Sequence, residues 1–157
     1  MNKKDYINKV FITNSSNETK KIGRDFAKSL EAGDVVTLYG DLGSGKTTFA
    51  QGLAEGLGIK KRIVSPTFVI VRTYEIQNSK FKSLEQGMFY HIDLYRTESE
   101  KDIEGLGLEE ILRDSENIVV IEWVEKMGKN LPKKRIDIKF FYEKESVRRI
   151  VFRSLNQ

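Results

Sequence analysis

The stretch that decides the fold of this chain is LYGDLGSGKTTFA, residues Leu38–Ala50. It contains Gly-x-x-x-x-Gly-Lys-Thr, from Gly40 to Thr47, which is the complete pattern of a phosphate-binding loop. The apolar, β-branched run Val35–Tyr39 precedes the loop and is expected to form a buried strand. The segment TTFAQGLAEGLG, residues 47–58, follows and is expected to be helical. A position between a buried strand and a helix is the setting in which this pattern binds a nucleotide.

The residue types of the loop suit a triphosphate. Glycines let successive backbone N–H groups turn inward and approach the anion, and the following helix adds its positive N-terminal end. Lys46 supplies a movable charge for the β- and γ-phosphates, and the hydroxyl of Thr47 suits Mg²⁺. The residues expected to hold the nucleotide are Gly40, Asp41, Leu42, Gly43, Ser44, Gly45, Lys46, Thr47 and Thr48.

Two strand-like segments offer the carboxylate that Mg²⁺ needs in such sites. Residues 88–95, MFYHIDLY, carry Asp93 near their end, and residues 117–123, NIVVIEW, carry Glu122. With a phosphate loop in the chain, we expect at least one of these acids to contact the metal. The other would orient or deprotonate a water molecule, and the sequence leaves the assignment open. Trp123, next to Glu122, is expected either in the core or near the nucleotide.

Composition is that of an ordinary globular protein. The chain has 157 residues, 39% of them hydrophobic and 32% charged, and its net charge of +4 is too mild to indicate RNA binding by itself. The absence of cysteine excludes a disulfide framework, a thiol nucleophile and a cysteine-based zinc site. No apolar run approaches the roughly 20 residues of a membrane span, and the N-terminus lacks the apolar core of a secretory signal. We expect one domain over residues 1–157, with residues 1–8 a candidate flexible end, no membrane contact and a cytoplasmic location.

Strand and helix patterns alternate along the chain. A helix is expected within residues 15–33, capped by Ser16 or Asn17 and ended by Gly33. The other expected elements are strands within residues 9–13, 62–76, 88–95 and 117–123, a helix within 99–114, and a terminal hairpin within 135–152. This alternation predicts a three-layer α/β fold with a mixed, mostly parallel central sheet and a C-terminal antiparallel hairpin.

Two short patterns typical of guanine recognition are interpreted as coincidences. NKKD, residues 2–5, has no preceding strand to hold it, and DIEG, residues 102–105, follows TESEK rather than a buried strand. Adenine is therefore the preferred base.

Beyond the phosphate loop, five motifs occur in a specific order. GDLGSGKTT, VSPTF, HIDLYR, IEW and LP begin at residues 40, 64, 91, 121 and 131. In order and spacing they resemble the bacterial ATPase family TsaE, formerly YjeE, from about Phe11 to Phe152. The resemblance implies a P-loop NTPase-like fold and a partner-dependent ATPase. It also implies action with the TsaB–TsaD pair, which transfers a threonylcarbamoyl group to the adenosine beside the anticodon of tRNAs reading A-starting codons.

The resemblance also implies residue roles, carried over position by position. Residues 40–46 should cradle ATP, with Lys46 counted among the catalytic groups. Thr47 and Glu122 should bind Mg²⁺, and Asp93 should be needed for hydrolysis. Direct contact with tRNA would be weak or absent.

At some positions the alignment with the family is less firm, or the residue differs from the usual one. Thr13 falls near where family members touch the nucleotide, and Arg148 or Arg149 does so from the last hairpin. Ser44 stands where alanine is commoner, and a hydroxyl facing the phosphates should be tolerated. Val124 stands where proline or serine is more familiar, so the local turn can differ.

Several residues keep more than one interpretation. His91 is either packed structure or a group that organises the neighbouring acid or contacts a partner. Arg96 is an arginine-finger candidate, a salt-bridge residue or a partner contact. Residues 65–68, Ser-Pro-Thr-Phe, form either a switch loop or a plain turn. The basic groups at 60–62 and 133–135 are either solvated surface or contacts with tRNA or TsaD.

Three classes of function fit the sequence. The first is a partner-dependent ATPase within a tRNA-modifying assembly. The alternative is a small P-loop kinase of a metabolite or nucleotide, although no arginine-bearing lid is evident between Asp93 and Glu122. The third is a nucleotide sensor that binds ATP without needing to hydrolyse it.

Overall fold

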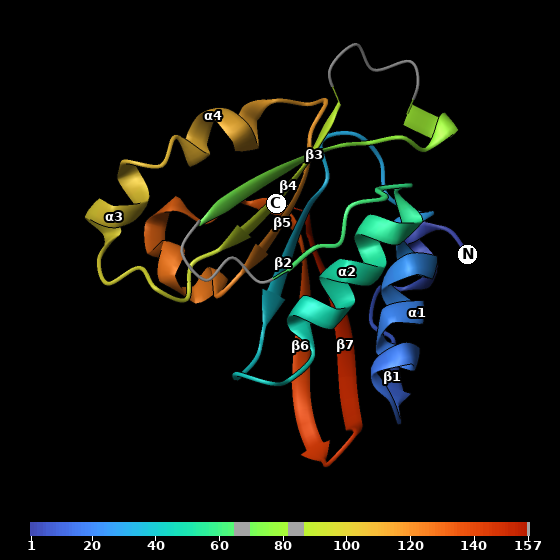
Figure 1. Cartoon of the computed structure of the whole chain (residues 1–157). Helices are drawn as coiled ribbons and strands as arrows, with labels where there is room; N and C mark the ends of the chain where they lie inside the picture. Colours follow the sequence, from blue (N-terminus) through green and yellow to red (C-terminus); the bar gives the residue numbers. More distant parts are fainter. Residues whose placement is uncertain (65–69, 82–86, 157) are drawn as a thin grey trace.

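The computed structural model describes residues 1–64, 70–81 and 87–156, which form one mixed sheet with helices on both faces (Figure 1). This is the three-layer α/β fold that the sequence predicts. The order of the seven described strands is β1 (Val10–Thr13), β7 (Val147–Asn156), β6 (Lys134–Lys144), β2 (Val35–Tyr39), β5 (Ile118–Glu122), β4 (Met88–Asp93) and β3 (Val71–Glu75).

The strand directions match the predicted mixed sheet. The pairs β6–β2, β2–β5 and β5–β4 are parallel, so the four central strands run the same way. The pairs β1–β7, β7–β6 and β3–β4 are antiparallel, which confirms the C-terminal hairpin. Parallel strands have their carboxyl ends at one edge of the sheet, so the segments that follow β2, β4 and β5 meet there.

Two layers of helices cover the sheet (Figure 1). On one face lie α1 (Ser16–Ala27) and α2 (Lys46–Gly56), and on the other lie α3 (Glu100–Glu104), α4 (Leu108–Arg113) and the 3₁₀ helix η3 (Val124–Asn130). Two further 3₁₀ turns are η1 (Lys3–Asp5) and η2 (Ser79–Phe81). None of the helices in residues 1–64, 70–81 and 87–156 combines the length and the apolar composition of a membrane span.

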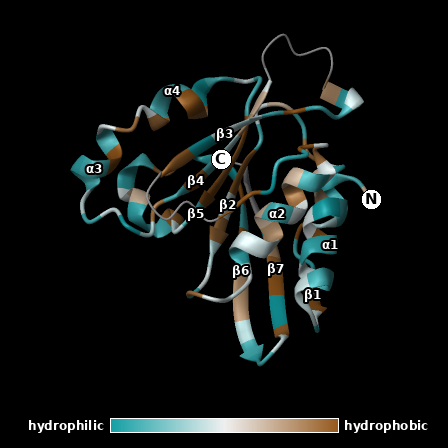
Figure 2. Ribbon diagram, in the orientation of Figure 1, coloured by the Kyte–Doolittle hydropathy of each residue, from teal (hydrophilic) through white to brown (hydrophobic). Residues whose placement is uncertain are grey.

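Strand β5 is one of the four parallel strands in the middle of the sheet, and its residues before Glu122 are hydrophobic (Figure 2). Its five residues all have little exposed surface. Ile118 and Val120 pack in the core beneath α1 and α2, whereas Val119 and Ile121 pack in the core beneath α3 and η3. A continuous apolar run is typical of a parallel strand that helices cover from both sides.

The ends of the predicted helices differ from the sequence expectation. Ser15, and not Ser16 or Asn17, caps α1, because its extended backbone lets its hydroxyl accept the N–H of Glu18 at 3.2 Å. The helix ends at Ala27, well before Gly33.

The helix expected within residues 99–114 is two short helices. Gly105 to Gly107 separates α3 from α4, and Gly107 has a φ of 69°, which is incompatible with a continuing helix. The strand expected within residues 62–76 is β3 alone, and residues 65–69 lie outside the described part of the chain.

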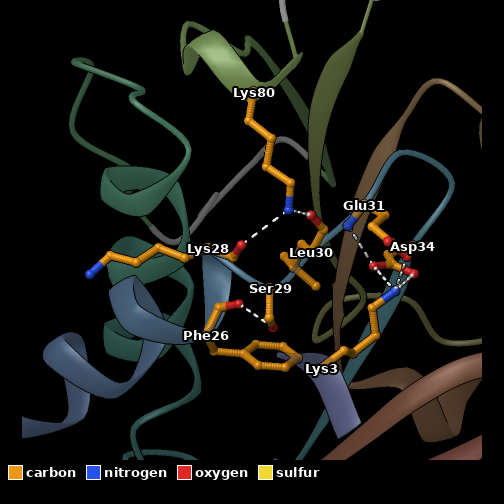
Figure 3. A network of polar contacts seen from close by, with 8 residues as sticks. All are labelled: Lys3, Phe26, Lys28, Ser29, Leu30, Glu31, Asp34 and Lys80. Atoms are coloured by element: carbon orange, nitrogen blue, oxygen red, sulfur yellow. Dashed lines mark hydrogen bonds and ion pairs between the residues drawn. The ribbon is translucent and has the colours of Figure 1, made fainter. Parts of the chain in front are cut away.

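The N-terminal segment packs against the edge of the sheet opposite the phosphate loop. Tyr6 is buried, and Lys3 Nζ lies 3.0 Å from Glu31 Oε2 and 2.6 Å from Asp34 Oδ2 (Figure 3). In the same network, Lys80 Nζ donates to the carbonyl oxygens of Lys28 and Leu30, just after the end of α1. A cation at this position also suits the negative end of the helix dipole.

Close contact between α1 and α2 depends on glycine. A Cβ at Gly52 of α2 would lie 2.1 Å from the carbonyl oxygen of Lys20, and one at Gly23 of α1 would lie 2.3 Å from that of Phe49. Both carbonyl oxygens belong to the backbone of a helix, so they can move only if a whole helix shifts. This contact fixes the position of α2, and with it the start of the helix that follows the phosphate loop.

We predict that Gly52→Ala lowers the free energy of unfolding by about 1–3 kcal/mol, because the methyl group forces the helices apart. The loss should appear despite the gain in helix propensity of about 1 kcal/mol that alanine brings. Urea denaturation measures the change. The matched control is Gly105→Ala, whose Cβ would meet only the carbonyl of Lys101 at 4.0 Å. An equal loss in the control would contradict the packing argument.

Candidate functional site

The phosphate loop leads from the end of β2 into α2. Gly43 has a φ of 76° and Gly45 a φ of 106°, values that residues with side chains rarely adopt. Gly45 is also the N-cap of α2, and it provides no capping side chain. The first N–H groups of α2 therefore lack the partner that Ser15 gives to α1, which leaves them suited to bind an anion.

A cavity of about 300 Å³ opens in front of this helix end. Among the described residues it is lined by Ser15, Ser16, Thr19, Leu42, Gly43, Gly45, Lys46, Thr47, Thr48, Asp93, Tyr95, Glu122, Trp123, Ser146 and Arg148. The phosphate loop, both strand-end acids and the hairpin arginine thus share one cavity.

Lys46 lies in the floor of the cavity and is 5% exposed. Its Nζ donates to the carbonyl oxygens of Gly40 at 2.5 Å and Asp41 at 2.9 Å, and it lies 4.5 Å from the centroid of the Trp123 ring. Burial lowers the pKa of Lys46, and the nearby carboxylate of Glu122 opposes that shift.

The two acids lie side by side at the carboxyl edge of the sheet. Asp93 and Glu122 are register partners of the parallel strands β4 and β5. Glu122 is 1% exposed, and its Oε1 accepts the hydroxyl of Thr47 at 2.9 Å. Asp93 is 7% exposed, and its Oδ1 accepts the backbone N–H of Tyr95 at 3.0 Å.

The oxygen atoms of Thr47 and Glu122 fit a magnesium ion. Mg²⁺ prefers oxygen ligands and usually combines one or two carboxylates with water and substrate phosphates. Thr47 and Glu122 would supply two of these oxygen ligands, and the cavity beside them gives access to water and to phosphate oxygens for the others.

Not every predicted nucleotide residue lines the cavity. Thr13 is 1% exposed, and its hydroxyl shares a hydrogen bond of 2.7 Å with that of Thr19, which does line it. The hydroxyl of Ser44 is buried without a hydrogen-bond partner in the described structure, close to where a Cβ of Gly40 would lie. Thr13 therefore contacts the cavity only through Thr19, to which it is hydrogen-bonded. Ser44 packs inside the phosphate loop and does not line the cavity.

The hairpin arginines point to different surroundings. Arg148 lines the cavity, and its Nε donates to the carbonyl of Gly43 at 3.2 Å. Arg149 instead pairs with Glu143 at 2.6 Å and lies over the ring of Phe141. Of the two candidates, only Arg148 is placed beside the phosphate loop.

Sequence reasoning missed part of the cavity wall. Ser15, Ser16 and Thr19 come from the start of α1, and Ser146 comes from the turn before β7. The sequence predicts that a helix begins near Ser15 and Ser16, but nothing in the sequence places the start of that helix beside the phosphate loop.

Other candidates lie elsewhere. Arg96 is exposed and does not line the cavity, and residues 60–62 are also exposed. Lys133 and Lys134 are exposed, whereas Arg135 pairs with Asp137 at 2.8 Å. The predicted switch segment, residues 65–68, falls outside the described residues.

The sequence over residues 13–150 matches the protein family described as "Threonylcarbamoyl adenosine biosynthesis protein TsaE". The chain belongs to the TsaE family. This confirms the resemblance drawn from the five motifs, and the family takes part in tRNA threonylcarbamoyladenosine biosynthesis.

Similar proteins carry the TsaE name in distant bacteria. The tRNA threonylcarbamoyladenosine biosynthesis protein TsaE of Bacillus subtilis is 41% identical over 135 residues, which are 86% of this chain and 78% of that protein. TsaE of Streptomyces coelicolor is 41% identical over 122 residues, 76% of each chain. The crystal structure of B. subtilis YdiB superposes with a TM-score of 0.74 at 34% identity, covering 94% of this chain and 86% of YdiB. The structural likeness confirms the P-loop NTPase-like fold of this TsaE-family chain.

We predict that the fluorescence of Trp123 changes when a nucleotide enters the cavity. Trp123 is the only tryptophan of the chain, it lines the cavity, and its ring contacts both Lys46 and Tyr95. Titration with Mg²⁺ and ADP should give a saturable change in emission. Unchanged emission while calorimetry detects binding would contradict this placement.

We predict that Arg148→Ala weakens nucleotide binding by about tenfold, because it removes a charged donor beside the phosphate loop. Arg149→Ala removes the same charge from outside the cavity and should leave the affinity unchanged. Isothermal titration calorimetry with ADP compares the two. An equal loss of ADP affinity in both variants would contradict the prediction. It would mean that the net positive charge of the protein, and not the position of Arg148, sets the affinity.

Proposed function

We propose that this protein is a Mg²⁺-dependent ATP hydrolase that acts with the TsaB–TsaD pair. The pair would place the threonylcarbamoyl group on the adenosine beside the anticodon of tRNAs that read A-starting codons. The observation that carries the proposal is the hydrogen bond between Thr47 and Glu122, next to the phosphate loop. It brings a loop hydroxyl and a strand-end carboxylate together where a nucleotide-bound metal needs both.

Each residue has a role in this proposal. The phosphate loop and the N-terminus of α2 hold the phosphates, and Lys46 neutralises charge on the β- and γ-phosphates. Mg²⁺, held by Thr47 and Glu122, would supply further positive charge to the phosphate oxygens.

Asp93 is the group we assign to the attacking water. Its carboxylate lines the cavity, and the N–H of Tyr95 holds one of its oxygens in place. It can orient the water or accept its proton, as a general base does. This divides the two acids, with Glu122 on the metal and Asp93 on the water.

The surroundings of the cavity support a partner-dependent activity. Leu42, in the phosphate loop, is 73% exposed, and Tyr95 is 48% exposed. Leu42 and Tyr95 both line the cavity, so a partner that binds over them would also exclude water from the phosphates. We therefore propose that the protein hydrolyses ATP slowly by itself and faster when TsaB and TsaD are bound. We further propose that it makes at most weak direct contact with tRNA and that it acts in the cytoplasm.

The kinase alternative gains no support from the cavity. Among its described lining residues, the cations are Lys46 and Arg148, and both lie against the phosphate loop. A kinase that closes a cationic lid over the phosphates needs further arginines.

We predict that Lys46→Ala abolishes ATP hydrolysis and strongly weakens ATP binding, because it removes the cation aimed at the phosphates. Asp93→Asn should bind ATP and fold as the unchanged protein does, but lose hydrolysis. Release of phosphate, measured with and without the cognate TsaB–TsaD pair, tests both. The control is Glu104→Gln, which likewise replaces a carboxylate by an amide, but on the exposed surface of α3 away from the cavity.

The other outcomes separate the alternatives. Full turnover by the Lys46→Ala protein would contradict the mechanism. If the Asp93→Asn protein binds ATP, cannot hydrolyse it and still supports tRNA modification, the protein is a sensor. If ADP forms only when a small phosphoryl acceptor is added, it is a kinase.

A further inference from the structure

The only histidine of the chain, His91, lies entirely inside the protein. It is in the middle of β4, and its Nε2 lies 2.5 Å from Oε2 of Glu122 on the neighbouring strand. Its Nδ1 is buried and has no hydrogen-bond partner among the described residues. Among the described residues, the imidazole therefore has one polar contact, which is with a proposed metal ligand.

The carboxylate of Glu122 is held from two sides. Oε1 accepts the hydroxyl of Thr47 from α2, and Oε2 faces His91 from β4. We assign the hydrogen of this bond to Nε2 of His91, because a carboxylate that binds a metal accepts hydrogen bonds and does not donate them. Each oxygen thus has its own donor, and rotation about the last bond of the glutamate side chain would break both bonds.

Packing alone does not account for a histidine at this place. An imidazole with an unpartnered buried nitrogen carries a desolvation cost that a leucine or phenylalanine would avoid. What the imidazole supplies, and an apolar residue cannot, is an N–H directed at Oε2. Glu122 is 1% exposed, so water cannot readily replace that donor.

We propose that His91 is a positioning residue for the metal ligand Glu122. By holding Oε2, it keeps Oε1 directed toward Thr47 and the place where Mg²⁺ would bind. The inference rests on the proposed Mg²⁺ site, and it adds a third element, β4, to the support of that site. Groups behind a metal ligand orient it and tune its affinity in this way.

The test compares His91→Gln with His91→Asn. The side-chain amide nitrogen of glutamine reaches about as far as Nε2, whereas that of asparagine reaches only as far as Nδ1. Mn²⁺ binding to the complex with a non-hydrolysable ATP analogue is measured by electron paramagnetic resonance. We expect His91→Asn to weaken Mn²⁺ binding by about 10- to 100-fold and His91→Gln to stay close to the unchanged protein. Affinity for the analogue in the presence of EDTA should be the same in all three proteins.

Phe89→Leu is the matched control for stability. Phe89 lies on β4 two residues before His91 and is equally buried, so the substitution should destabilise the fold without touching Glu122. Melting temperatures are compared across the set. Unchanged Mn²⁺ affinity in His91→Asn, or an equal loss in Phe89→Leu, would overturn the inference.

A second measurement needs no substitution. Because the chain has one histidine, ¹⁵N-labelled imidazole gives a single set of resonances. We expect the spectrum of the Nε2–H form, and a shift of Nε2 when Mg²⁺ is added to the complex with the ATP analogue. Nε2 resonances that Mg²⁺ leaves unmoved would overturn the inference.

If the protein without substitutions binds no Mn²⁺ with the ATP analogue, the proposed Mg²⁺ site itself is wrong. That outcome differs from failure of the His91 role alone, in which Mn²⁺ binds but its affinity does not depend on His91.

Discussion

The parallel pairing of β2, β5 and β4 is the constraint on which the site depends. In this arrangement Leu38 pairs with Glu122, and Glu122 pairs with Asp93, so that three strands end at one edge of the sheet. The phosphate loop leaves β2 at that edge, and α2 turns back over the sheet, bringing Thr47 within 2.9 Å of Glu122. A shift of one residue between β4 and β5 would place Asp93 and Glu122 on opposite faces of the sheet, so that one of them would point away from the phosphate loop.

The outer elements complete the cavity around this edge. Helix α1 packs so closely on α2 that glycine is needed at the crossing, and its N-terminal end then lies beside the phosphate loop with Ser15 and Thr19 in the wall. The antiparallel hairpin β6–β7 reaches the same place and delivers Arg148 to the carbonyl of Gly43. Thus elements from both ends of the chain contribute to one site, with the central strands as the frame.

The site concentrates buried polar groups in a small volume. Lys46, His91, Asp93 and Glu122 all have less than a tenth of their surface exposed. Burying such groups is costly unless they bond to one another or serve a ligand. Here the lysine is held by loop carbonyls, and Glu122 is held by Thr47 and His91. This arrangement, in which buried polar groups are held in place before a ligand binds, suits the phosphate and metal site that we propose for this TsaE-family protein.

The sequence by itself determined the phosphate loop, the strand-end acids, the order of strands and helices, and the family. These follow from local rules, because glycine spacing, β-branched runs and motif order are properties of neighbouring residues. Only the tertiary structure decided that Arg148 and not Arg149 faces the loop, that Thr13 stands behind Thr19, and that His91 contacts Glu122. Each of these three placements depends on which strands are neighbours in the sheet and on which face of the sheet the side chain lies. Sheet pairing joins residues dozens of positions apart, and no local pattern in the sequence encodes it.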